Sequence, residues 1–197
     1  MNSSLRRCWR GGGLRLTVGL LVVAGCASSQ THLDVPIDPT SGHAQHAPSD
    51  TVVTVTVHDL RWKIHADGTR EAAFGVSMGD LQFSPPAPII VRQRLEFELD
   101  RIAASHGATQ KRAFACDLIR FDVRTDTSPL YWDVVATISL VLTESGRDSI
   151  RLSSTATQRT WTWPGASVIQ QSVSLALDSL TTQLNARAKE LAVAPTP

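Results

Sequence analysis

The sequence predicts an α+β fold, a two-layer sandwich in which two helices cover one face of an antiparallel sheet of about five strands. Two kinds of periodicity lead to this prediction. Several segments alternate apolar and polar residues, as strands with one buried face do. Two longer segments repeat apolar residues every three or four positions, as amphipathic helices do. We expect the order β-β-α-β-β-β-α within one domain at 51–193, followed by a short tail at 194–197.

The first half of this domain is predicted to begin with two strands. Residues 51–58 alternate around three valines, which indicates the first strand. A turn signal, Asp67-Gly68, separates it from a second strand at 71–78. The next segment, 79–88, contains three prolines and is expected to be a loop.

Helices are predicted over 88–106 and over 166–192, because each segment carries an apolar stripe on one side. The stripe residues are Val91, Leu95, Leu99, Ile102 and Ala103 in the first helix and Val173, Leu177, Leu180, Leu184, Ala188 and Leu191 in the second. Three strands are expected between the helices, at 114–124, 131–143 and 149–162. The middle one has the longest alternation, which favours a sheet with one face on the core.

Residues 1–25 have the composition of a secretory signal. They carry four arginines and no acidic residue before an uncharged apolar run at 16–24. That run would rise only about 14 Å as a helix, whereas a bilayer core is roughly 30 Å thick. The segment is therefore expected to be a cleaved signal rather than a membrane-spanning helix.

The apolar run ends in Val23-Ala24-Gly25-Cys26, which resembles a bacterial lipobox. In a lipobox the cysteine receives lipid on its sulfur and becomes the first mature residue, so the resemblance implies lipidation of Cys26. Ala27 follows the cysteine in place of an aspartate. This implies sorting to the periplasmic face of the outer membrane. The alternative is an ordinary signal peptide that is cut after Ala24 or Gly25.

Residues 26–50 are predicted to form a flexible tether between the lipid and the domain. They consist mainly of Ser, Thr, Asp, Pro, His, Gln and Ala, and neither periodicity survives in them. A flexible chain of this length has a typical end-to-end distance of about 27 Å. His43 and His46, with His32 upstream, lie in this segment. We interpret them as solvated side chains, and the sequence predicts no metal and no cofactor.

The charge of the mature chain argues against a nucleic-acid partner, and its cysteines argue against a disulfide or a reactive thiol. Four of the 19 Lys and Arg residues lie in 1–25, which leaves 15 against 18 Asp and Glu. No basic stripe remains to neutralise a phosphate backbone, so we expect no nucleic-acid partner. Cys116 has no second cysteine in the domain to pair with, and we expect a buried, unreactive thiol that is dispensable for function.

The sequence contains none of the motifs that would indicate an enzyme. It has no glycine-rich phosphate loop between a strand and a helix, no Gly-x-Ser-x-Gly elbow and no His-Glu-x-x-His pair. Asp122 and Asp126 could form a carboxylate pair, but their positions indicate strand-end and turn residues. We therefore predict that the protein has no catalytic residues.

Two residue pairs form the predicted ligand or partner surface. Asp59 and Arg61 lie two positions apart and share a face of the strand, either as a polar anchor for a ligand or as a structural ion pair. Trp161 and Trp163 also share a face and could form a platform for a lipid, a glycan or a partner protein, because their amphipathic rings favour half-wet surfaces. The alternative for the tryptophans is a core rim under the second helix.

Taken together, these features resemble the YajG-like family of small outer-membrane lipoproteins. The matching segments are Cys26-Ala27-Ser28-Ser29, His58-Asp59-Leu60-Arg61 at the end of the first strand, and the two helices. The expected fold is also similar to that of the insertion-partner lipoproteins of lipopolysaccharide transport and the auxiliary lipoproteins of lipid-trafficking ABC systems.

We expect a non-catalytic, lipid-anchored protein that binds a partner or ligand in the periplasm. Its membrane contact would run through the lipid on Cys26. Two alternatives stay open. One is an accessory subunit of an envelope transport or outer-membrane assembly complex, and the other is an envelope hydrolase.

Overall fold

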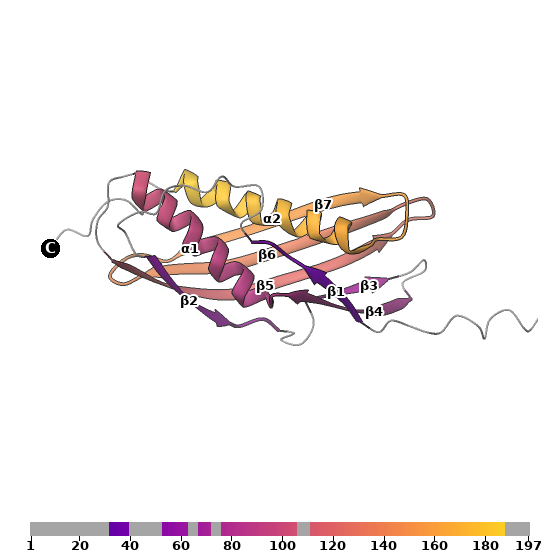
Figure 1. Cartoon of the computed structure of the whole chain (residues 1–197), viewed down its shortest axis with the longest axis horizontal. Helices are drawn as coiled ribbons and strands as arrows, with labels where there is room; N and C mark the ends of the chain where they lie inside the picture. The colour runs from indigo at the N-terminus through magenta and orange to yellow at the C-terminus, as the bar shows by residue number, and fades with distance from the viewer. Residues whose placement is uncertain (1–31, 40–52, 63–66, 72–75, 106–110, 188–197) are drawn as a thin grey trace, which may run out of the picture.

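The computed structural model describes residues 32–39, 53–62, 67–71, 76–105 and 111–187. Its elements in chain order are β1 His32–Pro36, β2 Val53–Asp59, β3 Gly68–Glu71, β4 Ser77–Ser84, α1 Ala87–Ser105, β5 Arg112–Thr127, β6 Trp132–Glu144, β7 Ile150–Thr160 and α2 Ala166–Ala186 (Figure 1).

The fold is α+β, as predicted, but the sheet is larger than expected and of mixed direction. The described residues contribute seven strands to it rather than about five, in the order β1-β4-β3-β5-β6-β7, with β2 paired to β5. The pairs β3–β4, β5–β6 and β6–β7 are antiparallel, whereas β1–β4, β2–β5 and β3–β5 are parallel. The prediction of a wholly antiparallel sheet is therefore wrong. Parallel neighbours need a crossover connection, and α1 supplies one between β2 or β3 and β5.

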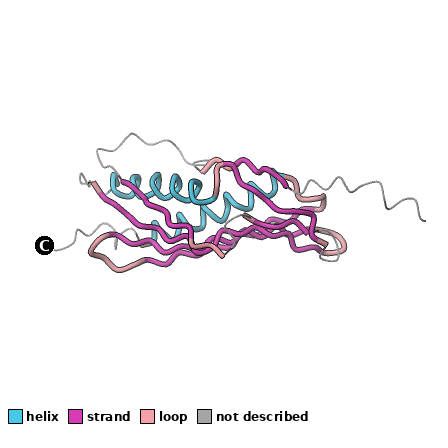
Figure 2. The backbone as a smooth tube through the Cα atoms, turned by 90° about the horizontal axis from the view of Figure 1, so that it is seen from below, coloured by secondary structure: helices cyan, strands magenta, loops and turns pink. Residues whose placement is uncertain are grey.

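Both helices form a second layer on one face of the sheet, and Figure 2 shows them running along the long strands. α2 packs on β6 and β7 and also reaches β1, while α1 packs on β2. The predicted stripes are buried between the layers, and the stripe residues that the structure describes are Val91, Leu95, Leu99, Ile102, Ala103, Val173, Leu177, Leu180 and Leu184. None of the described helices is long and apolar enough to cross a membrane.

The prediction of a flexible tether over 26–50 is wrong for its middle part. Residues 32–36 form β1, which pairs in parallel with β4. Val35 and Ile37 are buried in the core, so this apolar pair outweighs the linker-like composition around it. The folded domain therefore includes residues before 51, and the rest of the predicted tether lies outside the described residues.

The predicted strand at 71–78 and the predicted loop at 79–88 are also corrected. The structure places a strand, β4, over Ser77–Ser84, with Leu81 and Phe83 buried in alternation. Gly79 interrupts this pattern with a φ of 109°, a conformation that L-residues rarely adopt.

Asp67-Gly68, predicted as a turn, instead leads into β3. A Cβ atom at Gly68 would collide with the backbone carbonyl of Val123, so glycine permits the close approach of β3 to β5.

The other elements match the prediction in kind and differ at their ends. α1 covers almost all of the predicted 88–106, and β5, β6 and β7 occupy the predicted strand regions. α2 begins at the predicted 166 but ends at Ala186, with Arg187 as its C-cap, rather than at 192. The two stripe residues Ala188 and Leu191 lie outside the described residues.

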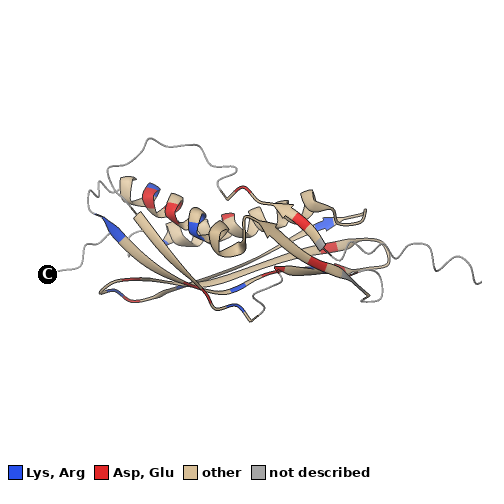
Figure 3. Cartoon of the chain, turned by 60° about the horizontal axis from the view of Figure 1, so that its bottom comes forward, with Lys and Arg blue, Asp and Glu red and all other residues tan. Residues whose placement is uncertain are grey.

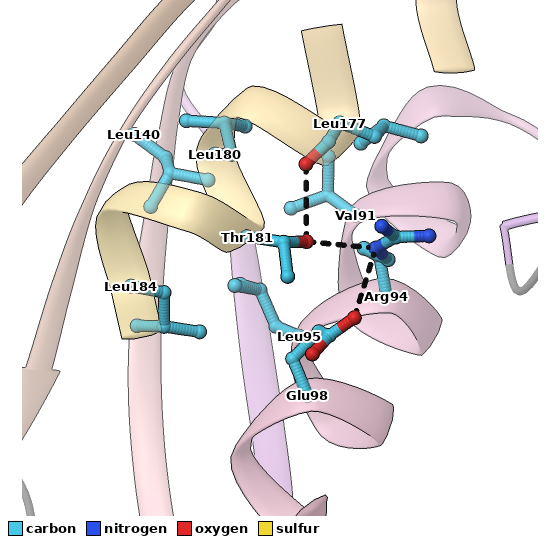
Figure 4. A pocket seen from close by; sticks show the side chains of 9 residues that line it. All are labelled: Val91, Arg94, Leu95, Glu98, Leu140, Leu177, Leu180, Thr181 and Leu184. Atoms are coloured by element: carbon cyan, nitrogen blue, oxygen red, sulfur yellow. Dashed lines mark hydrogen bonds and ion pairs between the residues drawn. The ribbon is translucent and has the colours of Figure 1, made fainter. Parts of the chain in front are cut away.

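A buried charged cluster lies between the two helices, where only apolar residues were expected. Arg94 of α1 donates from Nε to Thr181 Oγ1 of α2 at 3.0 Å and lies 3.5 Å from Glu98 Oε1 (Figure 4). It also donates from Nη1 to the Pro39 carbonyl and from Nη2 to Asp178. Arg94 therefore ties the segment after β1 to both helices. The cavity beside it is only about 10 Å³, roughly the space of one water molecule.

Candidate functional site

β2 and β3 pair with the same edge of β5, one after the other, and the chain leaves this edge between them. The β2–β5 register ends at Asp59, and the β3–β5 register begins at Gly68. The intervening residues, 60–67, are too many to follow the stretch of β5 opposite them, so the ladder is interrupted. We call Asp59 to Trp62 together with Asp67 the strand break.

A three-residue ion cluster holds the strand break. Arg61 donates from Nε to Asp59 Oδ1 and from Nη2 to Asp59 Oδ2, both at 2.8 Å, and from Nη1 to Asp67 Oδ1 at 2.6 Å. The second oxygen of Asp67 accepts the backbone N–H of Phe83 on β4 at 2.8 Å. The Arg61 side chain is only 6% exposed. The cluster therefore joins the ends of β2 and β3 to β4 in a bidentate geometry that favours strong hydrogen bonds.

The ionisation of this cluster is reinforced by its hydrogen bonds. The side-chain hydrogen bonds from Arg61 lower the pKa of Asp59 against the opposing effect of burial. Burial opposes the charge of Arg61, but its bonds to Asp59 and Asp67 outweigh this effect and raise the pKa of the guanidinium. The geometry thus gives Asp59 and Arg61 a structural role, because both Asp59 oxygens and all three Arg61 nitrogens already have partners inside the protein.

Leu60 and Trp62 alternate with Asp59 and Arg61 and are exposed to solvent. Leu60 is 58% exposed and Trp62 is 95% exposed. The Leu60 N–H donates to the carbonyl of Leu118, which places Leu60 beside the exposed Ile119 of β5. Neither Leu60 nor Trp62 belongs to the predicted surface, although their period-two alternation with two charged residues contains the signal. The ion cluster thus anchors an exposed apolar pair.

A groove runs beside the strand break, between the outer edge of β2 and α1. Its volume is about 360 Å³, and it is lined by Thr54, Val55, Thr56, Val57, Pro88, Ile89, Arg92 and Glu96. Among the described strands, only β5 pairs with β2, so the other edge of β2 faces this groove. Glu96 Oε1 accepts one edge N–H, from Val55, at 3.1 Å. An unpaired strand edge beside a helix is a surface to which an extended peptide can bind.

The predicted tryptophans lie elsewhere, at the end of the sheet where β5 turns into β6 and where β7 ends. Tyr131 and Trp161 make an edge-to-face ring contact with centroids 5.6 Å apart, and Trp132 and Trp163 make another at 5.9 Å. Strand alternation puts Trp132 on the helix side and Tyr131 on the open side. We call these four residues, with Leu130 at the hairpin tip, the aromatic end.

Neighbouring side chains fix the rings of the aromatic end. Arg159 lies 3.8 Å from the Tyr131 ring centroid and forms two hydrogen bonds with Asp133, whose pKa they lower. Arg70 of β3 lies 6.0 Å from the Trp163 ring centroid. These contacts are cation–π interactions, which favour a defined ring position.

The aromatic end nevertheless leaves large apolar surfaces open. Leu130 is 74% exposed, Trp161 is 67% exposed and Trp163 is 38% exposed. Val76, at the start of β4 on the same end of the sheet, is 57% exposed. The tryptophans are therefore more than the core rim that was the alternative prediction, although Trp132, which was not predicted as a site residue, is half-buried.

The structure does not bring the two predicted residue pairs together. Asp59 lies opposite Leu118 near the middle of β5, whereas Trp132 lies opposite Thr127 at its end. Nine residues of strand separate these rows, roughly 30 Å at the usual rise per residue. The protein therefore presents two separate candidate surfaces.

Other groups that could carry chemistry are isolated or buried. Burial, followed by the nearby charge of Asp117, raises the pKa of Cys116 to about 12, which is the environment of an unreactive thiol. His58 Nδ1 lies 3.0 Å from Asp117 Oδ1 on the open face, and neither residue lines the groove. In the part of the chain that the structure describes, no group of three His, Cys, Asp or Glu side chains could hold a metal.

Charges of both signs are interspersed over the molecule. Figure 3 shows acidic and basic residues following one another along the ribbon of α1. The long strands carry them mainly as ion pairs, such as Arg120 with Asp122 and Arg124 with Asp126. Within the described residues, this arrangement offers no single-sign field for steering a charged ligand.

Comparisons with known proteins show similarity only to solved structures. No family model and no curated protein matches this chain. The chain is similar to the crystal structure of an uncharacterized protein, with 11% identity and a TM-score of 0.46. It is also similar to a Xanthomonas campestris protein of the family DUF330, with 12% identity and a TM-score of 0.44. Each similarity covers 81% of this chain and 97% of the other chain.

Proposed function

We propose that this protein is a non-catalytic, lipid-anchored lipoprotein of the cell envelope that binds a partner protein in the periplasm. The anchor would be lipid on Cys26, at the periplasmic face of the outer membrane. The lipobox-like segment ending at Cys26, the alanine after it and the apolar run before it support this location. The resemblance to the YajG-like family belongs to the same proposal.

The observation that carries partner binding is the exposure of Trp62 on a rigid support. A 95% exposed tryptophan side chain gains almost no hydrophobic stabilisation from the fold, and no contact in the described structure compensates for its exposure. Its neighbour Arg61 is fixed by two carboxylates, so the backbone that carries Trp62 is already held in place before a partner binds. Tryptophans in such positions are frequent hot spots of protein interfaces.

The groove along β2 extends this surface. A partner segment paired with the free edge of β2 would lie between that edge and α1, with Leu60 and Trp62 at one end of its path. This observation favours a second candidate function, an accessory subunit of an envelope transport or outer-membrane assembly complex, because strand pairing suits a stoichiometric partner. The envelope hydrolase stays the alternative of another class.

Site-specific photocross-linking in cells tests the partner surface. We expect p-benzoylphenylalanine in place of Trp62 to give one discrete cross-linked protein, and the same probe in place of Arg151 to give none. Arg151 is a suitable control because it is exposed on the open face of β7, away from the groove. The free energy of unfolding of Trp62→Ala should lie within about 0.5 kcal/mol of the wild-type value, since an exposed side chain contributes little to stability.

Equal labelling at positions 62 and 151 would contradict the proposed partner surface. A small molecule turned over by the purified protein, with loss of turnover in a variant at His58 or Asp117, would instead support the hydrolase.

A further inference from the structure

We propose that the aromatic end rests on the surface of the lipid bilayer, so that the domain stands on the membrane with its strand break directed away from it. This inference rests on the proposed lipid at Cys26 and adds an orientation to it. Three observations carry it: the direction in which the chain enters the sheet, the side chains at the aromatic end, and the contrast with the opposite end.

The chain enters the sheet at the aromatic end. β5 runs toward that end, β3 is parallel to β5, β4 is antiparallel to β3, and β1 is parallel to β4. β1 therefore runs away from the aromatic end, and its first residue, His32, lies on that side. The directions of the strand arrows in Figure 1 follow this path.

The connection from the lipid to the sheet is short. Cys26 and His32 are six residues apart in the sequence, so a fully extended chain places them at most about 21 Å apart. By strand register, His32 lies in the same row as Arg124, three residues before the row of Thr127 and Trp132. Three residues correspond to roughly 10 Å of strand. The lipid can thus reach the level of the aromatic end, which lies about half as far from the row of His32 as the row of Asp59 and Leu118 does.

The side chains at the aromatic end suit a membrane interface. Trp161 and Trp163 project from the end of β7, and a hydrogen bond from the Thr162 N–H to Thr160 Oγ1 holds the turn that carries them. Leu130 and Val76 are exposed at the same end of the sheet. Tryptophan and tyrosine are enriched at the level of lipid headgroups, where their rings contact acyl chains and their polar atoms contact water.

The charges near these rings are compatible with a headgroup layer. Arg159 is paired with Asp133 at 2.8 Å, and Arg124 is paired with Asp126 at 3.3 Å. In these two pairs the basic partner limits the repulsion of the acidic group from anionic lipids. Arg159 also lies over the Tyr131 ring, as a side chain that keeps its charge at the water boundary does.

The opposite end of the same strands has a different character. The β6–β7 hairpin, residues 145–149, has only polar residues and glycine at its tip, and Glu144 binds Arg112 at 2.7 Å and Arg147 at 3.0 Å. One end of the long sheet is therefore fitted for water and the other for a half-wet interface, and β1 begins toward the second.

Quenching of tryptophan fluorescence by brominated lipids tests this orientation. The native lipoprotein is reconstituted into vesicles of phosphatidylethanolamine and phosphatidylglycerol with bromine on the upper acyl chain. We expect wild-type fluorescence to be quenched and Trp161→Phe combined with Trp163→Phe to lose most of this quenching. Trp62→Phe is the matched control and should keep it, because Trp62 lies away from the membrane. Circular dichroism confirms that each variant is folded.

The two proposals fail in different ways. An acylated protein that floats with the vesicles but shows equal quenching in the double variant and in wild type would overturn the orientation and leave the lipid anchor intact. Loss of quenching in Trp62→Phe instead would also overturn it, because the strand break would then face the lipid. A mature chain without acyl groups on Cys26 would overturn the proposed function and, with it, the argument from reach.

Discussion

The strand break and the aromatic end both expose large apolar side chains, but different forces hold them. At the strand break, a buried guanidinium and two carboxylates fix the backbone, and Trp62 extends from it with 95% of its surface open. At the aromatic end, the rings contact one another edge to face. In each pair the tryptophan after β7 is exposed and its partner ring is half-buried. The first arrangement holds the backbone that presents one exposed tryptophan, and the second forms a broader apolar edge.

This difference matches the two kinds of surface that we propose they contact. A protein partner offers a shaped pocket, so a single tryptophan on a well-held backbone can supply a large share of the binding energy. A bilayer has no fixed pocket, so several interfacial rings spread over an edge are more suitable than one. The ion cluster and the ring pairs are therefore the features whose removal should affect the two regions differently.

The largest effect on stability is expected for Arg61→Ala at the strand break. The change leaves the Asp59 and Asp67 carboxylates, which are 20% and 10% exposed, without their shared cation. Removal of one partner from a buried ion pair typically costs about 3–5 kcal/mol. Urea unfolding followed by circular dichroism measures the change.

Arg159→Ala provides the matched comparison at the aromatic end. Its guanidinium is half exposed, so loss of its pair with Asp133 should barely change the urea midpoint. Similar midpoints for the Arg61 and Arg159 variants would show that the ion cluster does not support the strand break.

A smaller effect is expected in the response to acid. The hydrogen bonds from Arg61 lower the pKa of Asp59 below the ordinary value of about 3.9. The stabilisation from this carboxylate is therefore complete above that value and is lost as the pH falls through the lower pKa of the folded state. Asp59→Asn should lower the stability at neutral pH and flatten its decline below about pH 4.

Asp133→Asn sharpens this comparison. Arg159 also lowers the pKa of Asp133, but that pair lies at the surface, where solvent screens it. We expect its acid unfolding curve to follow wild type, and thermal melts at a series of pH values measure both variants. If the pH dependence of the melting temperature changed more in Asp133→Asn than in Asp59→Asn, the stabilising carboxylate would be Asp133 and not Asp59.

Periodicity in the sequence predicted the elements that bury one continuous stripe. α1, α2 and the strands β5, β6 and β7 are long enough for the apolar repeat to dominate local exceptions. β1 was missed because it has only five residues and its pairing partner, β4, is distant in the sequence. β4 was missed because Gly79 and the prolines after it resemble a loop. Nonlocal pairing decides both cases, and a local pattern does not contain it.

The candidate site was predictable only in part, for a related reason. The spacing of Asp59 and Arg61 correctly suggested that they share a face, but their common partner Asp67 belongs to the far side of a break in the ladder. Trp161 and Trp163 were identified as a pair, whereas each contacts a different ring from the β5–β6 turn. Side-chain contacts between distant strands depend on register, which the sequence pattern alone does not specify.

The most direct test of the lipid anchor, on which the orientation of both regions depends, is the intact mass of the wild-type protein isolated from the cell envelope. We expect a mature chain that begins at Cys26 and carries the additional mass of a diacylglyceryl group and an amide-linked acyl chain. Cys26→Ser should abolish this added mass and remove the processed protein from the membrane fraction. An unmodified wild-type chain, cut after Ala24 or Gly25, would contradict the account.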